Sequence, residues 1–175
     1  MMRLFHISDD ATLTRFEPRP ADTNTWPQLT RRYVWVVSDE MIHNYFFPRN
    51  CPRVCWMIGP ETTQEEKDRF RKVGDQRAII AVEQGWKDRI AACTLYQYEF
   101  SPRNFYPIDY CAGYYISEQA EIPIAVHTLH NPFELLTERG VRVEFHDDLE
   151  PVRQMTANSN YRFSNIRMRF LRTMM

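Results

Sequence analysis

Glycine is scarce in this chain, with only five among 175 residues. So few glycines leave little material for the loops that cradle phosphates, and neither a P-loop nor a GxGxxG motif is present. The HExxH motif of zinc proteases and the GxSxG motif of serine hydrolases are absent too. Any activity must therefore be argued from individual side chains.

Long apolar runs are also missing, and cysteines are few. No segment approaches the roughly 20 apolar residues of a membrane-spanning helix, and the N-terminus turns polar at Ser8, before a secretion signal could form. The four cysteines are too few for a disulfide framework in a chain of this size, and Cys51 and Cys55 do not form a CxxC pair. We expect a cytoplasmic protein with buried thiols and no membrane partner.

What the chain does have is apolar and aromatic material, at 43% and 14% of its residues. This composition predicts a single folded domain over residues 1–175. Turn signals and apolar periodicity divide it into short strands and helices. The predicted strands are 2–7, 33–38, 53–58, 77–82, 94–100, 113–117, 122–129 and 141–145. The predicted helices are 39–47, 62–73, 83–92, 132–139, 151–157 and part of 163–172.

These elements follow one another without a regular βαβ alternation. The order therefore predicts an α+β fold with a mostly antiparallel sheet and short flanking helices. Within it, the apolar run 78–82 indicates a strand buried on both faces. Thr62 and Glu65 have the spacing of a capping box at the start of the helix 62–73.

Positive charge gathers at the C-terminal end. After Glu150 the chain carries five arginines and no acid, whereas the first 150 residues hold 17 basic and 23 acidic side chains. Arginine suits bidentate contacts with carboxylate or phosphate. The segment either packs on the acidic remainder of the chain or contacts RNA, a nucleotide or a protein partner.

His6 is the most informative single residue. Alternation along the first strand places Leu4, His6 and Ser8 on one face and Phe5 and Ile7 on the other. His6 and Ser8 then either face water or line a pocket. In a pocket, the imidazole could orient a sugar hydroxyl or a phosphate; otherwise His6 is a half-buried residue satisfied by the backbone.

Aromatic and acidic residues follow Gly113. On a strand, Tyr114 and Tyr115 point to opposite faces, so one fills the core and the other, for which we take Tyr115, stacks on a planar ligand. Glu118 and Glu121 come directly after and are candidate catalytic carboxylates. The alternative is that both are solvated loop acids.

The turn from Pro48 to Arg53 is rigid and basic. Prolines on both sides of Arg49 could preorganise it, together with Arg53, for an anion, or the turn is a structural corner. A third kind of site, a metal centre, would need His127, His130 and His146. Their spacing does not predict it, and we assign no metal site.

Several motifs together resemble an uncharacterised bacterial family of similar length, a domain of unknown function. The resemblance covers nearly the whole chain and implies no activity. It is carried by LFHIS at residues 4–8, FEPRP at 16–20, PRNCPRV at 48–54, AGYYIS at 112–117 and SNIRMR at 164–169.

A second resemblance is to the ADP-ribosyltransferase-like fold. It is carried by an N-terminal strand with His6 and Ser8, a following β-prone run with Trp35, and a late Tyr-Tyr strand followed by acids. The resemblance implies that His6 holds the ribose of NAD, that an aromatic residue stacks on nicotinamide, and that Glu118 or Glu121 assists transfer. Trp35 stands where that aromatic residue is wanted.

Two functions from different classes follow. One is binding of NAD, as a substrate, or of another nucleotide in a cleft near His6, with ADP-ribosyl transfer. The other is a non-enzymatic module that contacts RNA or a protein through the C-terminal arginines.

Overall fold

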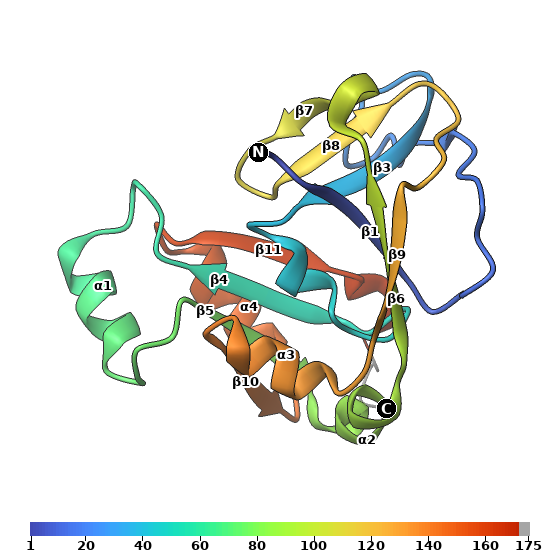
Figure 1. Ribbon diagram of the computed structural model, residues 1–175. Helices are drawn as coiled ribbons and strands as arrows, with labels where there is room; N and C mark the ends of the chain where they lie inside the picture. Colours follow the sequence, from blue (N-terminus) through green and yellow to red (C-terminus); the bar gives the residue numbers. More distant parts are fainter. Residues whose placement is uncertain (172–175) are drawn as a thin grey trace. The chain divides into compact units, whose positions relative to one another are not determined.

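The computed structural model describes residues 1–171, and the chain divides into two compact units, each with its own sheet (Figure 1). Unit 1 comprises Met1–Ile42 and Leu95–Leu129, and unit 2 comprises residues 43–94 and the chain from His130 onward. Short helices and mostly antiparallel strands confirm the α+β class. That the chain is one domain stays a prediction.

Unit 1 is built on an antiparallel sheet with the strand order β7-β8-β3-β1-β6-β9, and β2 pairs with β3. Some adjacent strands in this sheet, such as β1 and β6, come from distant parts of the sequence. The elements are β1 (Leu4–Ser8), β2 (Arg19–Pro20), β3 (Arg32–Ser38), β6 (Leu95–Phe100), η3 (Pro102–Asn104), β7 (Tyr106–Asp109), β8 (Tyr114–Ser117) and β9 (Ala125–Leu129).

Both faces of this sheet carry buried side chains, because successive residues of a strand point to opposite sides. On β3, Val34 and Val36 join the cluster around Tyr98 and Phe100. Tyr33, one residue earlier, joins a second cluster on the other face. The candidate residues of unit 1 can therefore be assigned to one face or the other.

Unit 2 has a four-stranded sheet with the order β10-β5-β4-β11, in which β10 and β5 are parallel and the other pairs antiparallel. Its elements are β4 (Arg53–Met57), α1 (Gln64–Arg71), β5 (Ala78–Glu83), η2 (Gln84–Trp86), α2 (Lys87–Ala92), α3 (Pro132–Glu138), β10 (Val141–His146), α4 (Glu150–Ala157), β11 (Arg162–Ile166) and η4 (Met168–Phe170). A further short helix, η1 (Ile42–Tyr45), begins at Ile42, where the first segment of unit 1 ends.

The central strand β5 is buried along its whole length, which confirms the expectation of burial on both faces. Ile79 and Ala81 pack with Phe70 of α1 and Val152 of α4. Ile80, which points to the opposite side, is completely buried as well. Across residues 1–171, no helix is both long and apolar enough to cross a membrane.

The predicted start of α1 is wrong by one residue. Thr63 is the N-cap, its hydroxyl accepting from the Glu66 amide while the Glu66 carboxylate accepts from the Thr63 amide. Thr62 is engaged in the preceding turn, where its hydroxyl accepts from the Gly59 amide and donates to the carbonyl of Asn160. A long-range contact thus decides which threonine caps the helix.

Three further elements differ from the prediction. The segment 39–47 holds only the 3-10 turn η1, because its residues from Met41 to Phe47 are almost all buried rather than forming one apolar stripe. The edge strand β7, which begins at Tyr106 and tolerates Pro107, was not among the predicted strands. The C-terminal segment forms β11 and η4 instead of a helix, because β11 pairs with β4. Residue 172 lies outside the described residues.

Candidate functional site

His6 lies in β1, and its half-buried ring makes a polar and an aromatic contact. Its Nδ1 is 3.1 Å from the carbonyl oxygen of Trp35. A carbonyl oxygen can only accept a hydrogen bond, so Nδ1 carries a proton. The ring also packs edge-on against Phe16, with centroids 5.0 Å apart. These contacts fix both the tautomer and the orientation of the imidazole.

Strand pairing identifies the residues that share a face with His6. Directly opposite residues of paired strands lie on the same face. His6 pairs with Tyr98 across β1 and β6, and Tyr115 belongs to the same apolar cluster as Tyr98. We call the surface formed by these and neighbouring side chains the His6 face: His6, Ser8, Phe16, Tyr98, Tyr115, Ser117 and Glu121.

The carboxylate of this face is Glu121. The Ser117 hydroxyl donates to Glu121 Oε1 across 2.6 Å, and both side chains are buried. Ser117 pairs with Val34, which belongs to the cluster on the His6 side of the sheet. The Glu121 backbone pairs in both directions with that of Phe16, at 2.8 and 3.0 Å. The ring that packs on His6 and the carboxylate are thus tied together.

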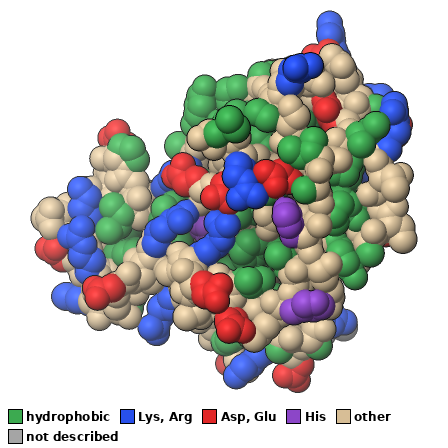
Figure 2. Space-filling model, in the orientation of Figure 1, with side chains coloured by type: hydrophobic (Ala, Val, Ile, Leu, Met, Phe, Trp, Pro, Cys, Tyr) green, Lys and Arg blue, Asp and Glu red, His purple; other side chains and the backbone are tan. Residues whose placement is uncertain are grey.

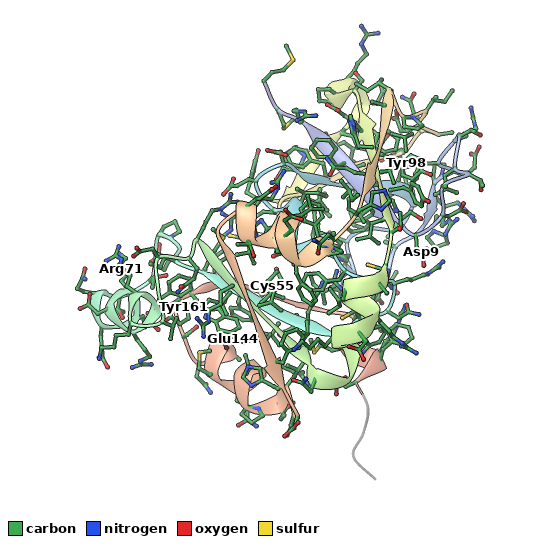
Figure 3. All side chains as sticks on the ribbon, turned by 60° about the horizontal axis from the view of Figure 1, so that its bottom comes forward. Asp9, Cys55, Arg71, Tyr98, Glu144 and Tyr161 are labelled. Carbon is green, nitrogen blue, oxygen red and sulfur yellow. The ribbon has the colours of Figure 1, made fainter. Side chains whose placement is uncertain are left out.

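The segment that follows β1 is held over the His6 face by hydroxyl groups. Tyr98, marked in Figure 3, donates to the carbonyl of Asp10 at 2.6 Å and accepts from the Leu13 amide at 3.3 Å. The Ser8 hydroxyl accepts from the Asp10 amide at 3.1 Å. Burial raises the pKa of Tyr98, so its hydroxyl stays protonated and can donate.

Trp35 and Glu118 do not belong to the His6 face. The Trp35 indole packs against Trp26 and Tyr114 on the opposite side of β3, with centroids 5.8 and 5.9 Å away. Only its backbone carbonyl reaches His6. Glu118 accepts from Arg31 at 2.6 Å and from the Tyr106 hydroxyl at 3.2 Å. The hydrogen bond from Arg31 holds the pKa of Glu118 below its usual value.

Arg49 and Arg53 belong to unit 2. Arg53 is buried, and it donates from Nε to the Asn44 carbonyl at 2.6 Å and from Nη1 to the Cys51 carbonyl at 2.7 Å. Cζ of Arg53 lies 5.4 Å from the centroid of the Tyr45 ring and 5.1 Å from that of the Phe47 ring, within the range of a cation–π contact. Arg53 therefore holds the corner together, whereas Arg49 is exposed.

The remaining candidates for a reactive centre are cysteines and histidines. Cys51 and Cys55 are buried, as expected, and burial raises the pKa of each thiol to about 12, so neither is a thiolate at neutral pH. The expectation of buried thiols is wrong for Cys111, which is exposed, and Cys93 is only partly buried. His127 and His146 lie at 3.4 and 3.3 Å from different carboxylates. Among residues 1–171, no three side chains of His, Cys, Asp or Glu are grouped to hold a metal ion.

Three members of the His6 face were not predicted from the sequence. Ser117 could have been, since it lies two residues after Tyr115 and alternation puts both on one face. Phe16 and Tyr98 could not, because their positions depend on pairing between segments more than 80 residues apart.

The chain belongs to a family of unknown function, DUF6886, whose model matches residues 5–170. This confirms the resemblance to an uncharacterised family, while the resemblance to the ADP-ribosyltransferase-like fold stays a prediction. A search of curated proteins and a search of solved structures each found no match.

Proposed function

We propose that unit 1 binds a nucleotide-like ligand on the His6 face, with NAD as the first candidate and ADP-ribosyl transfer as the chemistry. One observation carries the proposal: strand pairing gathers an oriented imidazole, a half-buried tyrosine and a buried carboxylate on a single face of one sheet. The sequence had marked all three, His6, Tyr115 and Glu121, as candidates.

Each residue has a role that its surroundings support. With Nδ1 engaged by a backbone carbonyl, Nε2 of His6 is suited to accept a hydrogen bond from a ribose hydroxyl. Tyr115 is half-buried, so part of its ring is available to stack on a planar base. Trp35, which points to the other side of the sheet, has no part in this scheme.

Glu121 would stabilise positive charge rather than act as a nucleophile. Transfer from NAD breaks the bond between the ribose anomeric carbon and the nicotinamide nitrogen, and the electron pair leaves with nicotinamide. The acceptor forms the new bond to the anomeric carbon and loses its proton. A carboxylate already held by Ser117 stabilises the positive charge that develops on the ribose, without having to reorganise.

The test is a thermal-shift titration with NAD, ADP-ribose and mononucleotides on the wild type, His6→Ala and a matched control, His127→Ala. His127 pairs with Gln97, so it lies on the face of the sheet opposite to His6. A ligand at 100 times its Kd stabilises the wild type by about 2.7 kcal/mol. His6→Ala should lose this shift while its own Tm stays within a few degrees of the wild type.

Two results would contradict the proposal. If His6→Ala binds as well as the wild type, the imidazole does not contact the ligand. If His6→Ala unfolds far below the wild type before any ligand is added, His6 is a core residue instead. Glu121→Gln separates the two parts of the proposal, because it should retain binding of NAD and lose the transfer rate.

A second function, of another class, is a non-enzymatic module that contacts RNA or a protein through the C-terminal arginines. Arg153 is paired with Glu150, whereas Arg167 and Arg169 form no ion pair within residues 1–171. Such binding would weaken steeply as salt rises and would be unaffected by His6→Ala. Binding that is insensitive to salt would exclude this function.

A further inference from the structure

Two distant segments of unit 2 meet at one end of its sheet. Ile166, the last residue of β11, pairs with Arg53, the first residue of β4. Arg167 and Arg169 follow directly after β11, and Arg49 lies in the turn that leads into β4. Antiparallel pairing therefore brings arginines from about 115 residues apart in the sequence to the same place.

Arg53 is the fixed member of this group. Its guanidinium donates to two backbone carbonyls, those of Asn44 and Cys51, and lies by the rings of Tyr45 and Phe47. A guanidinium has five N–H donors, so these two hydrogen bonds leave three. Because carbonyl oxygens carry no net charge, these two hydrogen bonds hold Arg53 in place without neutralising its positive charge.

The group lacks acidic partners. Within residues 1–171, none of its four arginines forms an ion pair, unlike Arg69 with Glu65 on α1, where basic and acidic side chains mix (Figure 2). The pKa of Arg167 is lowered, first by desolvation and then by the positive charges of Arg169, Arg53 and Arg49. Arg167 is thus repelled by three like charges.

The backbone is strained at the same place. Non-glycine residues rarely adopt a positive φ, and in residues 1–171 three do so. Two of them adjoin the arginines: Asn50, with φ 67°, and Arg167 itself, with φ 59°. Strain of this kind persists where the surroundings hold it, and it is concentrated at ligand-binding sites.

We propose that Arg49, Arg53, Arg167 and Arg169 form a binding site for a phosphate group. A terminal phosphate group offers two negative charges and three acceptor oxygens, and successive phosphates of a nucleic-acid backbone offer one charge each, so either neutralises several guanidinium groups at once. A carboxylate has one charge and two oxygens and would leave most of the group unpaired. This site lies in unit 2 and does not depend on the function proposed for the His6 face.

The experiment is isothermal titration calorimetry of the whole chain at low salt. The probes are pyrophosphate, inorganic phosphate and a single-stranded oligouridine RNA. The variants are Arg49→Gln, Arg167→Gln and Arg169→Gln, all of exposed residues, so each should fold. Arg69→Gln on α1 is the matched control, since it removes the same charge from the same unit. Arg53 is left unchanged because it holds the corner of residues 44–53.

We expect pyrophosphate to bind one to one, and each variant of the site to weaken it about tenfold or more, since it removes a charge-assisted hydrogen bond. Arg69→Gln should bind like the wild type. If only RNA binds, and the same variants lose it, the phosphate recognised is that of a nucleic-acid backbone. The proposal is overturned if no probe binds, if the variants keep full affinity, or if Arg69→Gln weakens binding equally.

Discussion

The hydroxyl of Tyr98 should decide whether the segment after β1 stays closed over the His6 face. Tyr98→Phe removes one oxygen and leaves a fully buried ring in place. That oxygen makes two hydrogen bonds, to the Asp10 carbonyl and from the Leu13 amide. At 0.5 to 1.5 kcal/mol each, their loss should lower the free energy of unfolding by about 1 to 3 kcal/mol. For a chain of this size, each kcal/mol lowers Tm by about 2 to 4 °C.

Urea denaturation measures the stability change, and amide hydrogen exchange locates it. The amides of residues 10–16 should exchange faster in Tyr98→Phe, while those of β3 should not change. The matched control is Tyr96→Phe, two residues away on the same strand and face, whose hydroxyl has no hydrogen-bond partner within residues 1–171. Equal stability of the two variants, or unchanged exchange in residues 10–16, would refute the argument that Tyr98 holds this segment.

Two further predictions concern the scaffold. Hydrogen bonds from the backbone of Asn160 and Thr63 lower the pKa of Glu66 to about 2, below its usual 4.5. The stability that Glu66 contributes is therefore present above about pH 4.5 and lost as the pH falls towards 2. In urea titrations, Glu66→Gln should be less stable than the wild type at neutral pH, and its stability should fall less between pH 4.5 and 2. The same dependence of stability on pH in both proteins would contradict this prediction. Gly113→Ala should destabilise unit 1 more than Gly140→Ala destabilises unit 2. Both glycines have φ near 70°, so the backbone cost of alanine is similar. A Cβ at residue 113 would in addition lie 2.6 Å from the Ser38 hydroxyl and 2.9 Å from Met41. Equal losses in urea denaturation would mean that the backbone conformation alone sets the cost.

The sequence predicts what depends on neighbouring residues. Alternation in residues 4–8 and the apolar run 78–82 predicted β1 and the doubly buried β5, since a strand's pattern is repeated at every second residue. What depends on a distant partner was missed. The strand β11 was read as part of a helix, because nothing in residues 162–166 reveals that they pair with β4. The choice of Thr63 over Thr62 as the cap has the same origin, a contact with Asn160.

The candidate site shows the same division. Alternation correctly separates Tyr114 from Tyr115, and the structure places Tyr115 with His6 and Tyr114 with Trp35. Alternation does not say which residues of β3 lie on the same face of the sheet as His6. Trp35 was therefore chosen, although its ring lies on the opposite face. Of two nearby acids, Glu121 lies on the His6 face and Glu118 does not, because Arg31 and Tyr106 bind Glu118 from other elements.

Composition is least informative for the arginines, because the role of an arginine depends on the group that it contacts. Arg3, Arg31 and Arg153 each form an ion pair with a carboxylate of the same chain, which compensates their positive charge. Arg53 has backbone carbonyls instead, which fix its position without neutralising its charge. A surplus of arginines after Glu150 does not indicate which of them pair with a carboxylate and which do not. The fold separates them, and it joins two C-terminal arginines to a turn more than a hundred residues earlier, where no carboxylate pairs with them within residues 1–171 and the proposed phosphate would supply the opposite charge.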